Sequence, residues 1–484
     1  SAHGLSETAS RHTFCAEFAG GGFENGGGTS AHDMQRRMFS PPSAPPQEPA
    51  PDKMQMNLLL PPTYSYLCPA MITYERHQLA NGLTVVANRD RTSQLAAVNL
   101  LYKVGARNEN PERTGFAHLF EHLMFRGTRR IPDFDRPVQM ACGDNNAFTN
   151  NDYTDYYITL PAVNVETALW LESDRMTGLD ISARKLALEK RVVVEEFRQR
   201  YLNQPYGDQT MLLRALAYRE HPYRWATIGL APEHIEEATL DDVRAFYRRW
   251  YRPSNAILSL SGDLPEERMF ALAEKWFGGI ENPADTPSAA PLPAEPEQRE
   301  PRRMEVVRDV PATAISIAFH IGGRTSRSFF AGDLTSDLLA GGDSGRLYQT
   351  LVKERRLFAS ANAYVSGDVD PGLFVFTGHL LPTTAPEQAE AAIWDEIDRL
   401  KNDPVPARET EKVKNKFEAN TLFGELNVMN KALNLGFYEM LGDLSLVDRE
   451  VELYRSIGAE EIMEFGRRVF RPENSSTLLY TAKR

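Results

Sequence analysis

Three residues of the pattern His-x-x-Glu-His, His118, Glu121 and His122, lie in the apolar stretch Gly115–Phe125, whose hydrophobic spacing predicts a helix. On a helix, positions 118 and 122 are one turn apart and share a face, so both imidazoles can bind one metal ion. Glu121 lies beside the second histidine, where a base must lie to activate water at the metal. The alternative is a pair of buried histidines bonded to backbone carbonyls. Because the chain has only 10 histidines in 484 residues, we favour metal chemistry.

A zinc enzyme needs a third protein ligand and one open position. The helical stretch Glu189–Arg198 contains Glu189 and Glu196, which are two turns apart and face the same way, whereas Glu195 points off that face. We predict that Glu196 is the third ligand and that Glu189 orients a ligand or the water. The alternative is a solvated, salt-bridging face, which is weakened by Val192–Val194 because these valines predict partial burial.

Alternating strands and helices must position these side chains. Leu95–Tyr102 is predicted to be an apolar strand, and Asn81–Gly82 a tight turn ahead of another strand. The segments Asn164–Thr177, Ala183–Tyr201 and Leu240–Trp250 have the hydrophobic spacing of helices. The fold class expected from this pattern is α+β.

The composition divides the chain into four parts. Residues 1–70 are rich in Gly and Pro, which predicts a flexible extension without a core. A catalytic domain is expected at 71–280, a proline-rich and charged linker at 281–303, and a second domain at 304–484.

The second domain resembles a copy of the first. Ala97–Arg107 is similar to Ala314–Arg324, with an offset of 217 positions (324 − 107 = 217). The same offset carries the His-x-x-Glu-His positions to Thr335, Leu338 and Leu339. We therefore predict an internal duplication whose second copy lacks the metal ligands.

The charge and cysteine content exclude several classes of protein. A net charge of −12 argues against non-specific nucleic-acid binding and indicates either a solvated acidic surface or an acidic chamber for basic peptides. The three cysteines, Cys15, Cys68 and Cys142, do not form a disulfide framework or a CxxC metal motif. The sequence contains no run of about 18 apolar residues, so no segment is predicted to span a membrane.

The sequence resembles the pitrilysin/insulinase family of zinc peptidases over about residues 72–480. The resemblance rests on His-x-x-Glu-His, which is the inverzincin signature, on the pair Glu189 and Glu196, and on the segment Asn145–Tyr156. It implies two homologous α/β-roll domains, each a mixed sheet covered by helices, that form half of a clam-shell chamber. It also implies one Zn²⁺ per chain and metalloendopeptidase activity on peptides or small unfolded polypeptides.

The resemblance further implies a sheet edge onto which a substrate peptide adds as an extra strand. Backbone pairing of this kind grips any sequence, and pockets on alternate residues add preference. The alternative is an ordinary internal strand and turn. The residues expected to bind substrate are Asn145, Asn146, Ala147, Phe148 and Thr149.

One departure from the family pattern concerns the second domain. Relatives usually carry an Arg and a Tyr seven residues apart that reach the active site, but the matching positions here hold Val352 and Ala359. Neither side chain can stabilise a tetrahedral intermediate. Arg355 or Arg356 is one substitute, although each turns to another face of the helix. The other is a homologous partner chain that supplies the pair in a heterodimer, with a homodimer as the alternative.

Two further classes of function compete with the peptidase. One is a catalytically silent structural subunit, which would be expected to have lost the His-x-x-Glu-His motif. The other is a module that captures substrate and needs its partner to cut. For location, the loose N-terminal region and the absence of an initiator Met favour a bacterial periplasmic protein, with the cytoplasm or the mitochondrion as alternatives.

Overall fold

The computed structural model describes residues 72–282 and 291–483. The predicted extension at residues 1–70 lies outside these residues, as do Cys15 and Cys68. Cys142 is exposed and is a free thiol. None of the helices in the described part of the chain combines the length and the apolar character that crossing a bilayer requires.

The first half of the described chain, residues 72–282, contains a six-stranded mixed sheet. Its strands are β1 (Glu75–Gln78), β2 (Thr84–Arg89), β3 (Leu95–Tyr102), β4 (Asp144–Thr149), β5 (Thr154–Pro161) and β6 (Ala256–Gly262). They lie in the order β1-β2-β6-β3-β5-β4, and only β2 and β6 pair in parallel. The predicted strand Leu95–Tyr102 is β3, in the interior of the sheet. The predicted turn at Asn81–Gly82 precedes β2, with Gly82 at φ 89°.

The helices of the first half other than α5 supply buried residues to the main hydrophobic core of this sheet. They are α1 (Phe116–Met124), α2 (Asp135–Met140), α3 (Val165–Gly178), α4 (Ala183–Phe197), α5 (Gln209–Ala217), α6 (Pro232–Glu236), α7 (Leu240–Trp250) and α8 (Glu266–Phe277). The predicted helix at Leu240–Trp250 matches α7, whose first turn is capped by the Thr239 hydroxyl. The predicted helix at Ala183–Tyr201 is α4 followed by a π-helical segment at Arg198–Leu202.

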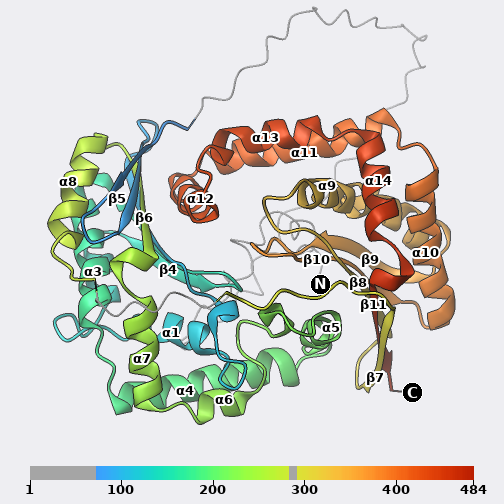
Figure 1. Ribbon diagram of the computed structural model, residues 1–484, viewed down its shortest axis with the longest axis horizontal. Helices are drawn as coiled ribbons and strands as arrows, with labels where there is room; N and C mark the ends of the chain where they lie inside the picture. Colours follow the sequence, from blue (N-terminus) through green and yellow to red (C-terminus); the bar gives the residue numbers. More distant parts are fainter. Residues whose placement is uncertain (1–71, 283–290, 484) are drawn as a thin grey trace, which may run out of the picture. The chain divides into compact units, whose positions relative to one another are not determined.

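The second half, residues 291–483, repeats this architecture. Its strands are β7 (Arg302–Arg308), β8 (Ala314–His320), β9 (Phe358–Val365), β10 (Leu373–Leu380) and β11 (Ser475–Ala482). Its helices are α9 (Arg327–Ala340), α10 (Pro386–Asn402), α11 (Ala407–Gly424), α12 (Val428–Leu441), α13 (Leu446–Ser456) and α14 (Ala459–Val469). The sheet order β7-β11-β8-β10-β9 reproduces β2-β6-β3-β5-β4, with one parallel pair, β7 and β11, at the corresponding place. Two mixed sheets with helices, related as copies, are therefore present (Figure 1).

The two halves exchange one helix each. Helix α12 belongs to the second half by sequence, yet it packs on β3 and β6 of the first sheet, where Ala97 contacts Val428 and Ala432. In return, α5 packs on the second sheet, where Leu213 and Ala217 join a cluster with Leu478 of β11. Each sheet thus has its second face covered by a helix from the other half.

The predicted domain boundaries do not coincide simply with these packing units. Strand β7 begins at Arg302, just inside the linker expected at 281–303, and residues 291–301 precede it without helix or strand. The division at 71–280 and 304–484 remains a prediction about the chain; α5 and α12 each lie within one part and pack on the sheet of the other.

Gly436 of α12 fits against the first sheet because it has no side chain. A Cβ at this position would lie 2.9 Å from both the Asn99 amide and the Ser259 hydroxyl, which are fully buried. The Ser259 hydroxyl already donates to the Ala432 carbonyl, so it cannot move away freely. We expect Gly436→Val to lower the free energy of unfolding by about 1–3 kcal/mol. Gly424→Val is the matched control in urea denaturation. Gly424 is the last residue of α11, and the nearest atom that an added Cβ would meet outside the backbone of its helix is 3.9 Å away. Equal effects of both substitutions would contradict the close packing of α12.

Candidate metal centre and active site

Helix α1 carries the His-x-x-Glu-His residues and begins after a glycine in the left-handed region. Gly115 precedes it at φ 90°, and a Cβ there would lie 2.6 Å from the Ile228 carbonyl oxygen. The carboxylate of Glu109 accepts the backbone N–H groups of Gly115 and Ala117, each at 2.8 Å. These bonds satisfy donors that a helix start leaves free, and they fix where α1 begins.

Helix α4 brings the predicted third ligand to α1. The two helices pack together, and α4 starts at the capping hydroxyl of Ser182, which accepts the Lys185 N–H. From α4, Glu196 places Oε2 3.3 Å from His122 Nε2 and 3.8 Å from His118 Nε2. One ligand atom from each of these three residues lies within 4.8 Å of the other two. The structure thus brings together the three residues predicted as ligands.

The electrostatics of this cluster differ between its members. Burial and the neighbouring charge of His122 lower the pKa of His118 to about 3. For His122, burial acts to lower the pKa, but hydrogen bonds to Glu189 and Glu196 outweigh it and raise the pKa to about 9. Burial acts to raise the pKa of Glu196, but the charges of His122, His118 and Arg200 outweigh it and hold the pKa at about 2. These shifts therefore favour an ionised Glu196 and a protonated His122 beside a neutral His118.

The geometry of the three residues fits a zinc ion. Zinc bound tetrahedrally to nitrogen and oxygen at about 2.0–2.1 Å requires ligand atoms about 3.4 Å apart. The Glu196 oxygen lies 3.3 and 3.8 Å from the two imidazole nitrogens, close to this requirement, and all three ligand atoms lie within 4.8 Å of one another. The buried Nδ1 of His118 has no hydrogen-bond partner among residues 72–282 and 291–483. Three protein ligands would leave a fourth position for water or substrate.

Glu121 lies on the same helix, close to the end of strand β4. Its carboxyl group is buried, and burial raises its pKa, although the Thr149 hydroxyl acts in the opposite direction. Its Oε2 atom has no hydrogen-bond partner in the described part of the chain. A buried carboxylate with one unpartnered oxygen beside two imidazoles is suited to accept a proton.

Glu189 lies behind the cluster and is fully buried. Its Oε2 atom is 3.6 Å from His122 Nδ1, and its Oε1 atom is 2.5 Å from Arg126 Nε. The carboxylate therefore contacts the nitrogen of His122 that faces away from Glu196. This is the arrangement expected of a residue that orients a metal-binding imidazole. Glu195 is exposed and points away, as predicted.

Sequence reasoning missed three charged residues that hold the cluster in place. Arg126 pairs with Glu189, Arg200 places a nitrogen 2.9 Å from Glu196 Oε1, and Glu109 caps α1. The signal for Arg200 was present, since it follows Glu196 by four residues on a helix. The contacts of Arg126 and Glu109 depend on tertiary packing, which local spacing does not reveal.

The segment predicted to bind substrate is an edge strand. Residues Asn145–Thr149 belong to β4, which ends the first sheet and has β5 as its one partner among the described strands. Ala147, Phe148 and Thr149 are buried, whereas Asn146 is exposed. Strand β4 also packs against α1. The free edge of β4 therefore ends, at Thr149, close to Glu121.

The two positions at which the family resemblance implies an Arg and a Tyr lie in the second half. Val352 is in a π-helical segment, Tyr348–Glu354, and Ala359 is on β9. Arg355 is paired with Asp395 at 2.8 Å, so its guanidinium is engaged within the second half. Arg356 has a positive φ of 50°.

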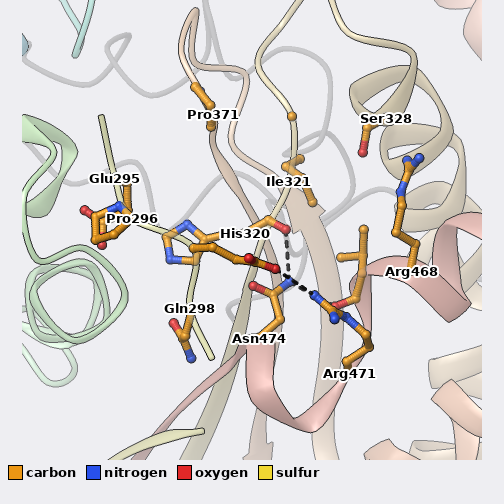
Figure 2. Close-up of a pocket in the computed structure, with 13 residues that line it drawn as sticks. Glu295, Pro296, Gln298, His320, Ile321, Ser328, Pro371, Arg468, Arg471 and Asn474 are labelled. Atoms are coloured by element: carbon orange, nitrogen blue, oxygen red, sulfur yellow. Dashed lines mark hydrogen bonds and ion pairs between the residues drawn. The ribbon is translucent and has the colours of Figure 1, made fainter. Parts of the chain in front are cut away.

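A cavity of about 260 Å³ lies away from the cluster (Figure 2). Its walls include His320 of β8, Arg468 of α14, Arg471 and Glu295. The His320 imidazole contacts the Ala217 carbonyl at 2.9 Å, and Glu295 accepts the backbone N–H groups of residues 219–221. His320 and Glu295 are therefore already engaged in contacts with the backbone. None of the predicted site residues lines the cavity.

Comparison with known families gives two matches. The family described as "Insulinase (Peptidase family M16)" matches residues 84–229, which include His118, His122 and Glu196. The description "Peptidase M16 inactive domain" matches residues 237–417, which include most of the second half. The second match agrees with a second copy that lacks the predicted ligands.

Individual relatives extend this similarity. The chain is 31% identical to "Zinc protease PqqE" of Helicobacter pylori over 345 residues, which cover 70% of this chain and 78% of that protein. It is similar to "The crystal structure of a protease from Helicobacter pylori" with a TM-score of 0.81 and 28% identity, covering 85% of this chain and 100% of that one. The periplasmic protease PqqL from Escherichia coli has the same fold, with a TM-score of 0.68 and 16% identity. That match covers 84% of this chain but 47% of that one.

Proposed function

The chain belongs to the insulinase family of peptidases, family M16, and from this premise we propose that it is a zinc-dependent endopeptidase in which His118, His122 and Glu196 hold the metal. The observation that carries this proposal is the convergence of these three ligand atoms, from two helices, within 4.8 Å. Peptidase activity is the function that the relatives' names support, since they are called zinc proteases.

The proposed mechanism assigns a separate task to each residue around the metal. Zinc held by His118, His122 and Glu196 would supply a Lewis acid for the scissile carbonyl and for water. Glu121 takes the proton from the attacking water and delivers it to the leaving amine. Glu189, held by Arg126, keeps the ring of His122 turned so that Nε2 faces Glu196. The carboxylate of Glu196 is kept in place by Arg200.

The proposed substrate is an extended peptide or a small unfolded polypeptide that pairs with β4. An edge strand offers backbone N–H and C=O groups to any sequence, which suits a peptidase with broad specificity. The strand ends at Thr149, close to Glu121, so a peptide paired with Asn145–Thr149 would run past the proposed base. This geometry supports cleavage within a chain.

We propose that a homologous subunit completes the active site. Val352 and Ala359 offer no group that can bind a tetrahedral intermediate, and Arg355 is paired with Asp395. Moreover, the PqqL chain is about twice the length that this chain matches, so one such chain has room for two halves of this kind. A partner that closes a chamber over β4 and brings an Arg and a Tyr fits both observations. A heterodimer is the form we favour, with a homodimer as the alternative.

A peptidase assay with metal analysis tests this function. The chain is purified alone and with its homologous partner, and cleavage of a quenched fluorogenic peptide is followed alongside zinc content. We expect one zinc per chain, weak cleavage by the chain alone, and a rise of at least about tenfold with the partner. Replacing the partner's Arg by Ala should remove this rise. Full activity of the chain alone, unaffected by that substitution, would contradict the role of the partner.

The same assay separates the competing functions. A silent structural subunit would show no cleavage in either preparation, whether or not it bound zinc. A substrate-capturing module would bind the peptide without the partner. It would not cut the peptide alone, even when the chain was in large excess over the peptide. A periplasmic location also remains a proposal, to be checked by fractionating the native cells.

A further inference from the structure

The backbone of β4 alternates between its partner strand and the free edge. In the turn that follows β4, the Asn150 N–H donates to the Tyr153 carbonyl at 3.0 Å, so residue 150 faces β5. Because orientation repeats every two residues in an antiparallel pair, Asn146 and Phe148 also face β5. The N–H and C=O groups of Asn145, Ala147 and Thr149 therefore turn to the free edge.

One of these outward N–H groups is already occupied. The Ala147 N–H donates to Oδ1 of Asn146, the preceding residue, at 2.8 Å. The Asn146 side chain is exposed and folds over the edge of its own strand to make this bond. It occupies the place where the carbonyl oxygen of an added strand would bond.

The second sheet contains the same arrangement. Strand β9 is the edge strand that corresponds to β4, and the Ser366 N–H donates to the Leu373 carbonyl at 2.8 Å beyond its end. Ala363 therefore faces the free edge, and its N–H donates to Oδ1 of Asn362 at 2.9 Å. The pair Asn362-Ala363 repeats Asn146-Ala147 with an offset of 216 positions (362 − 146 = 216). The same bond on both edges indicates a feature of the fold and not an accident of one side chain.

We propose that Asn146 is a displaceable cap on the substrate-binding edge: its carboxamide holds the Ala147 N–H in the free enzyme and is replaced by a carbonyl oxygen of the incoming peptide. This inference rests on the proposed strand addition at β4. Uncapped edge strands pair with other chains and promote aggregation. A single side-chain hydrogen bond is weak enough to be displaced by a peptide that makes several backbone bonds at once. Such a cap favours an extended peptide, which makes several backbone bonds, over a chance partner that offers only one carbonyl.

Two measurements on the full chain test the cap. The first is hydrogen–deuterium exchange at the Ala147 amide without peptide, resolved to single residues and corrected for intrinsic rates. We expect Asn146→Ala to speed this exchange by about tenfold, because the amide loses its acceptor. The second is the KM for an extended peptide, measured with the partner chain present. We expect KM to fall about 2- to 10-fold, since the peptide no longer competes with the carboxamide.

Asn362→Ala is the matched control, because it removes the same bond from the other edge. It should speed exchange at Ala363 and leave exchange at Ala147 and the KM unchanged. An unchanged exchange rate at Ala147 in Asn146→Ala, or a rise in its KM, would overturn the cap and leave strand addition intact. A peptide that fails to slow exchange at Ala147 in the Glu121→Gln variant would overturn strand addition, and the inference with it.

Discussion

Glu121→Gln is expected to lower kcat for peptide cleavage by about 10²- to 10⁴-fold while one zinc per chain stays bound. Glutamine has the shape of glutamate and keeps an oxygen acceptor, but it cannot take a proton from water. Glu121 is not one of the three residues that converge within 4.8 Å, so its replacement leaves the ligand set complete. The measurement combines single-turnover cleavage of a fluorogenic peptide with zinc content by mass spectrometry of the same sample.

The proton-transfer role also predicts how KM responds. Because Glu121 acts on water and not on the peptide backbone of β4, the loss should fall on kcat and leave KM within about threefold. Turnover near that of the unmodified chain would show that another group is the base. Loss of zinc together with activity would show instead that Glu121 supports the metal.

Glu196→Gln is expected to weaken zinc binding by about a thousandfold and to remove activity at limiting zinc. Structural zinc sites contribute about 10–16 kcal/mol, so one ligand of three accounts for roughly 4 kcal/mol. The neutral amide also loses the attraction that holds Glu196 between two imidazoles, which are 3.3 and 3.8 Å from its Oε2 atom. Competition with a fluorescent zinc chelator measures the change in Kd.

Glu195→Gln is the matched control for this experiment. It makes the same change one residue earlier on α4, but Glu195 is exposed and its carboxylate accepts only from Gln199 in the described structure. Zinc affinity and cleavage should therefore stay within about twofold of the unmodified chain. If both substitutions weakened zinc equally, the effect would come from the charge of α4 and not from ligation by Glu196.

Helical periodicity explains why so much of the cluster could be predicted from the sequence. His118 and His122 are four residues apart, and Glu189 and Glu196 are seven apart, so each pair shares a helix face whatever the tertiary structure is. That the faces of α1 and α4 meet could not be derived from spacing; it was inferred from the need of a zinc site for a third protein ligand, and the family resemblance agreed with it. The structure then placed Glu196 and both histidines together.

The contacts that hold the cluster could not be predicted in the same way. Glu109 reaches the start of α1 because the intervening chain turns back, with Gly115 at φ 90°. Arg126, in the turn after α1, meets Glu189 of α4. The exchange of α5 and α12 between sheets was equally hidden, since an amphipathic helix shows that one face is buried but not against which sheet.

Anomalous X-ray diffraction at the zinc edge, on crystals of the chain grown with zinc, tests the central claim most directly. The account predicts one strong peak per chain, about 2.0–2.2 Å from His118 Nε2, His122 Nε2 and a carboxylate oxygen of Glu196. A peak elsewhere, or no peak within bonding distance of Glu196, would contradict it.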